Sequence, residues 1–593
     1  MRDHARLCAD RRTTAWRAAA LGFTLLSGVA ATALMAEAAF ATGLGTWNLA
    51  CVVLIFFTTL WLAWGAAQSL VGLVPKRAHV TGNLPRPTAP TVVLLPICNE
   101  DARAAAARLT AMEGSCRVAG VRVDFAVLSD TRDGEALIRE RQAFAPLCVQ
   151  RPDRLRVYYR NRTDNWARKA GNIEDFIRTS GGAYEFAVIL DADSLMEGET
   201  IGHLIARMQA APDAGLLQTL PKIIGATSWF GRAMQFAAGF YSPVFARGLQ
   251  RMQGPTGPFW GHNAIVRVKA LASSCALPEL SGPPPFGGTI LSHDYVEAAL
   301  LARNGWRVDM DPTIPGSFEE GPDNLVAYAR RDRRWCQGNL QHMRIVGAPG
   351  LTAWSRFVFV QGIASYIVPL FWAGFLLSSM AALVAAPPPN YFPEPHQLFP
   401  VFPDRHMREI VALAIGIGGL LLLPKFGILA AAIGSGRTRG FGGSARAVLS
   451  VLAETLLSSL IAPIMLMYQS RAVIEVLSGK DGGWPATMRG EGRLSFAEGR
   501  TAAGWISLTG LAALCTVAWL GRDLLFWLLP VTLPMIAAPL LIATTSRAAP
   551  GGVFTVPDEV APSPVIAAYR AALGAEPAPR AAALPADKEA HVA

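Results

Sequence analysis

The stretch Phe186-Ala-Val-Ile-Leu-Asp-Ala-Asp193 decides how the middle of this sequence folds, because five apolar residues run directly into two carboxylates. A short apolar run with β-branched residues is typical of a buried strand in a parallel sheet. Asp191 and Asp193 can both face one site if the chain turns where the strand ends. We therefore expect a buried strand at 186–190 that ends in an acidic turn.

Two similar apolar runs precede this strand, each followed by polar residues: 91–97, followed by Asn99 and Glu100, and 123–128, followed by Asp130. Helix-like segments at 101–113 and 168–179 separate the three runs. Strands alternating with helices predict a doubly wound α/β sheet, in which ligands bind beyond the carboxyl ends of the strands. All three polar clusters fall at that edge.

Long apolar runs flank this α/β region. The 593 residues are 52% hydrophobic with a mean hydropathy of +0.30, which is too apolar for a typical soluble enzyme. Roughly 20 apolar residues cross a bilayer, and six runs reach that length: 16–40, 47–74, 357–385, 408–434, 503–519 and 523–544. The stretch 447–475 is also long enough, but it contains Glu454 and Pro463, so it is re-entrant, interfacial or a further crossing.

The first run is too long for a signal peptide and lacks a small-residue cleavage site, which predicts an uncleaved anchor. The basic residues before it predict a cytoplasmic N-terminus. Two crossings then return the chain to the cytoplasm at about residue 76. This predicts four regions: two transmembrane helices (1–75), a cytosolic α/β domain ending in an interfacial helix (76–356), a C-terminal transmembrane region (357–545) and a disordered Ala- and Pro-rich tail (546–593). We expect a periplasmic loop at 387–407, a cytoplasmic one at 435–446, an even number of crossings and a cytosolic C-terminus.

Charge and cysteine content exclude two other classes of site. The formal net charge of +10 comes partly from basic residues on loops that flank apolar runs, such as Arg437 and Arg439, so the expected partner is the lipid bilayer and not nucleic acid. The eight cysteines are scattered, without a CxxC pair or the spacing of a zinc site.

Asp191 and Asp193 are candidate metal ligands. Mg²⁺ is commonly held by one or two carboxylates together with substrate phosphates, so these residues predict a site for Mg²⁺ or Mn²⁺ with a nucleotide diphosphate. The same three-residue pattern occurs in Asp309-Met310-Asp311, but that stretch does not follow a clean apolar strand. Strand context favours the first triplet, although a solvated turn is the alternative interpretation.

Other residues at the same edge are candidates for binding the nucleotide: Asn99, Glu100, Asp130 and Lys169. Asp130 can contact the base or the ribose, although turn or helix capping explains such a residue equally well. Lys169 can pair with phosphate, although a lone lysine is more often a solvated surface residue.

Two later stretches supply candidates for catalysis and substrate binding. Ser292-His-Asp-Tyr-Val-Glu297 offers Asp294 as a general base, with His293 and Glu297 as competitors. In the stretch 330–339, four arginines crowd Trp335; guanidinium groups suit phosphate oxygens and an indole face suits a sugar ring. The alternatives are an ordinary helix start and a basic helix on lipid headgroups.

In this order, the elements resemble the processive family-2 glycosyltransferases of the cellulose synthase type, whose pattern is Asp, DxD, a TED-like base motif and QxxRW. Two positions depart from that pattern, because His293 stands in place of Glu and Arg331 in place of Gln. The phrases at 292–300 and 331–340 are instead similar to the bacterial glucans biosynthesis glucosyltransferase H family, as are those at 128–131 and 462–465.

This resemblance implies an inner-membrane enzyme that polymerises glucose from UDP-glucose into the β-1,2-linked backbone of osmoregulated periplasmic glucans. It implies a GT-A-like domain, an inverting mechanism, coupling to export, and the growing glucan and periplasmic glucan-processing proteins as partners. The implied roles are uridine binding by Asp130, Mg²⁺ and diphosphate binding by Asp191 and Asp193, and deprotonation of the acceptor by Asp294. Arg331 and Arg334 would bind the pyrophosphate and Trp335 the acceptor glucose.

Two other functions remain open at this point. One is a related β-glycan synthase of the cellulose or hyaluronan type. The other is a non-catalytic transporter with a nucleotide-sensing domain. No Walker-type GxxxxGK[ST] loop occurs in the sequence, and the glycines near Gly416 lie in an apolar run where helix packing explains them.

Overall fold

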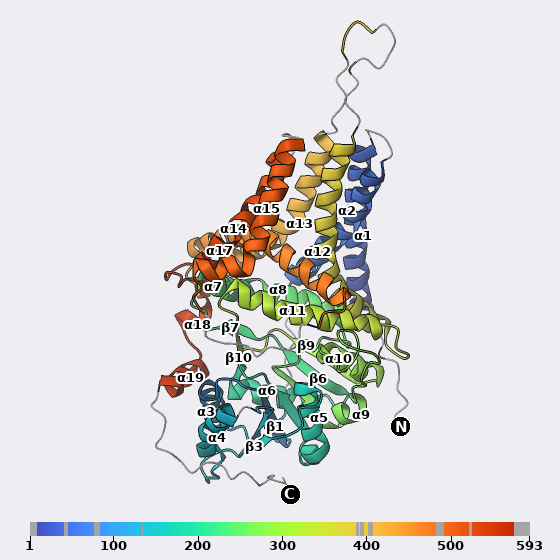
Figure 1. Cartoon of the computed structure of the whole chain (residues 1–593). Helices are drawn as coiled ribbons and strands as arrows, with labels where there is room; N and C mark the ends of the chain where they lie inside the picture. Colours follow the sequence, from blue (N-terminus) through green and yellow to red (C-terminus); the bar gives the residue numbers. More distant parts are fainter. Residues whose placement is uncertain are drawn as a thin grey trace.

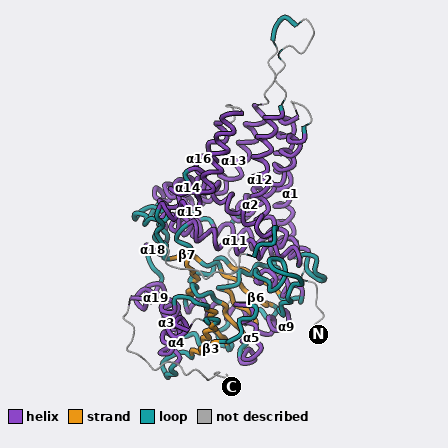
Figure 2. Tube along the Cα trace, in the orientation of Figure 1, coloured by secondary structure: helices purple, strands orange, loops and turns teal. Residues whose placement is uncertain are grey.

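The computed structural model describes residues 7, 9–40, 45–75, 84–132, 134–386, 391, 397–400, 407–481, 492–520 and 525–574. A bundle of long helices forms one end of the molecule and an α/β domain forms the other (Figure 1). The described strands all lie in the α/β end, as Figure 2 shows by colour. The helix α11 (Leu325–Gln341) lies across the junction between the two ends.

The α/β domain is built on a seven-stranded sheet of order β3-β2-β1-β4-β8-β6-β9. Its strands are β1 (Thr91–Ile97), β2 (Asp124–Ser129), β3 (Val157–Asn161), β4 (Phe186–Ile189), β6 (Ala214–Thr219), β8 (Ala264–Arg267) and β9 (Arg307–Asp311). The predicted strands at 91–97, 123–128 and 186–190 are therefore confirmed. β2 and β4 flank β1 and run parallel to it, so their carboxyl ends meet at one edge.

The predicted doubly wound α/β sheet is confirmed, with one strand, β8, reversed relative to the other six. β8 pairs antiparallel with both β4 and β6, which makes the sheet mixed. The direction of β8, a strand of four residues, was not predictable, because side chains alternate in the same way in parallel and antiparallel strands. A second, three-stranded sheet of order β5-β10-β7 lies beside the first, formed by β5 (Leu195–Met196), β10 (Ser317–Glu320) and β7 (Lys222–Ile224).

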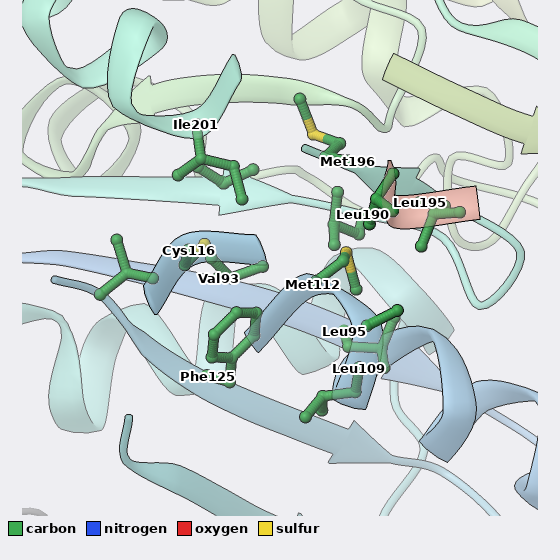
Figure 3. Packing of buried hydrophobic residues seen from close by; sticks show 14 of the residues in the cluster. Val93, Leu95, Leu109, Met112, Cys116, Phe125, Leu190, Leu195, Met196 and Ile201 are labelled. Atoms are coloured by element: carbon green, nitrogen blue, oxygen red, sulfur yellow. The ribbon is translucent and has the colours of Figure 1, made fainter. Parts of the chain in front are cut away.

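Apolar side chains of β1 alternate between two cores, since successive residues of a strand point to opposite faces. Val93 and Leu95 belong to one core and Val92 and Leu94 to the other. Figure 3 shows the first core, where Val93 and Leu95 lie near side chains of the helix that follows β1. Burial on both faces explains why the sequence of this strand is continuously apolar.

Helices cover the sheet and connect its strands: α3 (Ala102–Val118), α4 (Gly134–Cys148), α5 (Arg168–Ser180), α6 (Gly198–Ala210), α7 (Trp229–Phe240), α8 (Ser242–Gln253), α9 (Val268–Ser274) and α10 (His293–Arg303). α3 begins directly after β1, because the Asp101 carboxylate accepts hydrogen bonds from the backbone N–H groups of Arg103 and Ala104. The polar residues after β1 therefore lie in a tight strand-to-helix turn.

Six described helices are long and apolar enough to cross a membrane. They are α1 (Arg11–Phe40), α2 (Thr46–Leu73), α12 (Ala353–Ala385), α13 (Met407–Gly434), α14 (Ser444–Leu477) and α15 (Phe496–Leu520). The ambiguous stretch 447–475 thus lies in one continuous helix. The bend lies instead in the predicted span 523–544, where α16 (Leu525–Ile536) and α17 (Ala538–Thr545) meet at 58°. Most of the predicted loop at 387–407 lies outside the described residues.

The prediction of a disordered tail from residue 546 is wrong as far as Gly574. This segment forms α18 (Pro557–Val560) and α19 (Pro564–Gly574), and α19 packs on α3. Val565 and Ile566 are both 1% exposed, and full burial of such a side chain contributes about 1.5–3 kcal/mol. The buried side chains of α19 are Val565, Ile566 and Tyr569, a single short helical stripe in a segment otherwise rich in Ala and Pro. Residues 575–593 lie outside the described part.

Candidate active site

A cavity of about 1800 Å³ lies between the carboxyl ends of the strands and the helical bundle. Nine of the ten predicted site residues line it: Glu100, Asp130, Lys169, Asp191, Asp193, Asp294, Arg331, Arg334 and Trp335. The tenth, Asn99, lies at the end of β1 with a φ of 55°, and its backbone N–H donates to Thr131 Oγ1 at 2.8 Å. The structure therefore brings the separate sequence motifs to one space.

The triplet forms a turn directly after β4. The Asp191 N–H donates to Ser194 Oγ at 2.9 Å, and the Ser194 N–H donates back to the Asp191 carbonyl at 3.0 Å. Lys169 forms an ion pair with the Asp191 carboxylate and donates to the Gly261 carbonyl at 2.7 Å. The predicted phosphate-binding lysine is thus held at the first carboxylate of the triplet.

Two ionisable residues beside the triplet were not predicted from the sequence. His262 Nε2 lies 3.5 Å from Glu319 Oε2, and both residues line the cavity. Burial lowers the pKa of His262, but the nearby Asp191 and Glu319 outweigh it and raise the pKa overall. Burial raises the pKa of Glu319. His262 follows a turn and Glu319 lies in β10, so only the fold joins them to the triplet.

The triplet supplies two carboxylates, which could hold a metal only together with ligands from the substrate. The described residues contain no group of three or more His, Cys, Asp or Glu side chains that could hold a metal alone. Asp191 and Asp193 offer carboxylate oxygens beside the cavity, and the Asp191 side chain is 38% exposed. Two carboxylates fit Mg²⁺ or Mn²⁺ if a diphosphate and water supply the remaining ligands.

Asp130 is held rigidly at the end of β2. Arg162 binds its carboxylate with two nitrogens, one of them at 3.0 Å from Oδ2, and Asn172 donates to Oδ1 at 2.9 Å. Asn165 donates to the Asp130 carbonyl at 2.6 Å. Arg162 and Asn172 were not predicted, because Arg162 reaches Asp130 through the pairing of β2 with β3 and Asn172 through the placement of α5.

Asp294 lies in the first turn of α10 and lines the cavity. Its competitors His293 and Glu297 pair with each other at 3.1 Å, one helical turn apart. A Cβ placed on Gly261, whose carbonyl binds Lys169, would lie 3.5 Å from the Asp294 Cβ. Gly261 therefore lies beside the candidate base Asp294 and also binds Lys169, the lysine that pairs with Asp191. Burial raises the pKa of Asp294, which suits a carboxylate that accepts a proton near neutral pH.

The arginine-rich stretch forms the middle of α11. The Arg331 Cζ lies 4.6 Å from the centre of the Trp335 ring, and Trp335 is 43% exposed to the cavity. The buried Arg331 Nε has no hydrogen-bond partner among the described residues. Arg333 points away and binds Glu475 Oε2 at 3.4 Å and the Lys480 carbonyl at 3.0 Å. One face of α11 thus presents Arg331, Arg334 and Trp335 to the cavity.

The C-terminal part of α11 is fastened to the loop that precedes Asp294. The Leu291 N–H donates to Gln341 Oε1 at 2.9 Å, and His342 Nε2 lies 3.1 Å from the Ser292 carbonyl. A Cβ on Gly338 would lie 2.2 Å from Ser292 Oγ, so only glycine permits this approach. These contacts set the distance between the candidate base and the cavity face of α11, and the sequence alone gave no signal for them.

The cavity continues between two helices of the bundle. Trp61 and Gln68 of α2 line it, together with Gln361, Ser365 and Tyr366 of α12. Amide and hydroxyl groups are therefore present where the neighbouring helix surfaces are apolar. Such a lining gives a polar chain partners for hydrogen bonds at the level of the bundle.

Comparisons with known proteins agree with the geometry. Residues 186–418 match the family described as glycosyl transferase family group 2. The chain is 53% identical over 585 residues to a glucans biosynthesis glucosyltransferase H of Cereibacter sphaeroides, covering 97% of this chain and 98% of the relative. A protein of the same name from Rhodopseudomonas palustris is 42% identical, covering 87% of this chain and 71% of the relative.

Among solved structures, a mannosyltransferase from Pyrobaculum calidifontis in complex with GDP-Man and Mn²⁺ matches with a TM-score of 0.42. It is 16% identical to this chain, and the match covers 77% of this chain and 100% of the other. A likeness at this level carries no argument about the site.

Proposed function

The chain belongs to the family of glucans biosynthesis glucosyltransferase H proteins, and from this premise we propose that it polymerises glucose from UDP-glucose into a β-1,2-linked glucan. It is a glycosyltransferase with a GT-A-like α/β domain, as the family-2 match and the mixed sheet agree. The proposal rests on one observation. A single cavity is lined by the Asp191–Asp193 turn, by Asp294, by arginines of α11 and by residues of the helical bundle.

In the proposed reaction, the donor nucleotide lies across the carboxyl ends of β1, β2 and β4. Asp130 faces the uridine and is fixed by Arg162. Asp191 and Asp193 would hold Mg²⁺ or Mn²⁺, which when bound neutralises charge on the departing diphosphate. Lys169 binds Asp191 and the Gly261 carbonyl, and its ammonium group has a third proton to offer to a phosphate oxygen.

Asp294 acts on the acceptor. Its carboxylate accepts the proton of an acceptor glucose hydroxyl as the hydroxyl oxygen attacks the anomeric carbon of the donor. The bond from that carbon to the diphosphate breaks, and the diphosphate leaves with the electron pair towards Arg331 and Arg334. A single displacement inverts an α-linked donor and gives a β-linked product without a covalent sugar intermediate.

Trp335 binds the acceptor end of the product glucan, and the helical bundle provides its path. The exposed indole face of Trp335 suits stacking on the acceptor glucose. The polar groups of α2 and α12 then provide a route for the glucan. In this proposal residues 76–356 are cytosolic, the bundle lies in the bacterial inner membrane, and synthesis is coupled to export towards periplasmic glucan-processing proteins.

The proposal is tested by donor selection together with a base variant. Purified protein in detergent receives Mg²⁺ and equal concentrations of radiolabelled UDP-glucose, UDP-N-acetylglucosamine or GDP-mannose. Polymer is expected from UDP-glucose alone, and polymer from another donor only would contradict the proposal. The Asp294→Asn variant is expected to bind UDP as the wild type does and to lose polymer synthesis; retained synthesis would exclude Asp294 as the base.

A further inference from the structure

Arg108 of α3 is a buried arginine that the proposed reaction does not use. It is 3% exposed, and its Nη1 donates to the carbonyl of Ala192 at 3.0 Å. Its Nη2 lies 2.6 Å from Glu320 Oε1. Ala192 is the central residue of the acidic triplet and Glu320 is the last residue of β10, so one guanidinium group ties the backbone of the triplet to the second sheet.

Glu320 has a second partner in the C-terminal helix. The Tyr569 hydroxyl of α19 donates to Glu320 Oε1 at 3.1 Å. The Arg108 Cζ lies 4.9 Å from the centre of the Tyr569 ring. Burial raises the pKa of Tyr569 to about 12, so its hydroxyl remains a donor near neutral pH. Tyr569 therefore contacts both ends of the ion pair that holds the triplet.

Independent contacts keep α19 in place beside α3 (Figure 1). Val565 and Ile566 are buried in the same core as α3. Arg103 Nη2 donates to the Leu573 carbonyl at 2.8 Å on the outer side of this contact. Ser563 donates to Glu197, which follows β5 and so lies on the segment that continues from the triplet. The C-terminal segment thus contacts the protein around the triplet without lining the cavity itself.

We propose that α19 sets the geometry of the metal-binding triplet, with Tyr569 and Arg108 acting as positioning residues. The inference rests on the proposed function in one respect, since it takes Asp191 and Asp193 as metal ligands. Residues that orient metal ligands affect metal affinity about 10- to 100-fold. A contact that only stabilised the fold would change the melting temperature and leave the metal affinity of the folded protein unchanged.

The proposed effect on metal binding acts through the Ala192 carbonyl, which lies between the carboxylates of Asp191 and Asp193 and accepts from Arg108. With Arg108 bound to it, the peptide at Ala192 cannot rotate freely, and the side chains on either side keep one mutual arrangement. Without the Tyr569 hydroxyl, Glu320 loses a hydrogen bond and Arg108 is held less firmly over the triplet. The proposal therefore orders the variants: loss of the guanidinium should weaken metal binding more than loss of the hydroxyl.

The test measures metal binding and not activity. The full chain, purified in detergent with UDP, is titrated with Mn²⁺ while electron paramagnetic resonance reports free Mn²⁺. Arg108→Met is expected to weaken binding about 10-fold or more, and Tyr569→Phe about fivefold, the effect of one hydrogen bond. The control Arg103→Ala removes the outer contact of α3 with α19 and is expected to bind Mn²⁺ as the wild type does.

The outcomes separate this inference from the proposed function. Asp193→Asn should abolish most Mn²⁺ binding; if it does while Tyr569→Phe and Arg108→Met bind as the wild type, the positioning role is wrong and the metal site stands. If Asp193→Asn also binds normally, the metal is not at the triplet, and both proposals fail. If Arg108→Met does not fold, Tyr569→Phe decides, because it removes a single oxygen atom and retains the ring.

Discussion

The sequence contains the pattern Asp-x-Asp twice, and the two copies have different surroundings. Asp191-Ala192-Asp193 follows the end of β4 and lines the cavity. Asp309-Met310-Asp311 is the end of β9 itself, at the edge of the sheet. Asp309 pairs with Arg307, and Asp311 pairs with Arg207 at 3.0 Å. The first triplet is placed to meet a ligand and the second is bound to its own domain.

The strand context of an Asp-x-Asp triplet therefore has more predictive value than the triplet itself. The Asp191 side chain is 38% exposed and its partner is a lysine, whereas Asp311 is 10% exposed and is bound by an arginine and by Thr313. Burial alone would raise the pKa of Asp311, but the hydrogen bonds from Thr313 and the charge of Arg207 lower it. The Asp191 carboxylate lines the cavity, and the Asp311 carboxylate is held at a strand end.

The largest effect is expected from Asp193→Asn. Replacing one of two metal-binding carboxylates removes charge where the diphosphate leaves, so kcat should fall about 10²- to 10³-fold. The measurement is the initial rate of polymer synthesis from UDP-glucose at saturating Mg²⁺. A variant with wild-type kcat would show that the first triplet is no more catalytic than the second.

The next largest effect is expected in the pH dependence of kcat/KM, which depends on a third carboxylate, Asp294. Burial raises the pKa of Asp294, and a base must be ionised to accept a proton. We expect kcat/KM to fall about tenfold for each pH unit below that raised pKa, which lies above the ordinary value of about 4. Rates between about pH 4 and 8 locate the acid limb. A limb at or below the ordinary value would exclude Asp294.

Asp311→Asn should change stability and not chemistry. The variant loses an ion pair with Arg207 at a buried position, which should cost about 1–3 kcal/mol. Because the folded pKa of Asp311 is lowered, its contribution is present above the unfolded pKa near 4 and is lost as the pH falls through the folded value. Thermal unfolding in detergent at pH 7 measures the loss. Impaired kcat in the folded variant would contradict the assignment of Asp311 to structure.

The smallest effect is expected from Asp309→Asn. Burial raises the pKa of Asp309 despite the nearby Arg307, and Arg307 keeps a second partner in Asp213 at 2.9 Å. The neutral side chain should therefore change the unfolding free energy by less than about 0.5 kcal/mol. The same melting experiment checks this. A fall in both stability and activity would mean that the second triplet has a function beyond the strand.

The sequence predicted those parts of the molecule that depend on local pattern. The strands β1, β2 and β4 were visible as apolar runs, and the rule that parallel strands end at one edge brought Asp130 and Asp191 together. The bundle was visible as long apolar runs. Residues whose neighbours come from distant segments were not visible: Arg162 beside Asp130, His262 beside Glu319, and Arg108 beside Ala192.

One alternative left open and one wrong prediction have the same cause. The stretch 447–475 was ambiguous because Glu454 lies in it, and the structure pairs Glu454 with Lys425 of α13 at 2.7 Å. The tail was taken as disordered because it is rich in Ala and Pro without clear periodicity, yet Val565 and Ile566 of α19 are buried in the same core as side chains of α3. In both cases the stabilising partner lies on another helix, where sequence periodicity gives no information.

Linkage analysis of the product shows whether this chain makes a β-1,2-linked glucan. Purified chain with UDP-glucose and Mg²⁺ is expected to make a polymer whose permethylated hydrolysate contains 2-linked glucose as its main internal residue. Synthesis of 4-linked glucan alone would contradict the account, because the carboxylate turn, the base and the arginine helix would then serve a cellulose-type product.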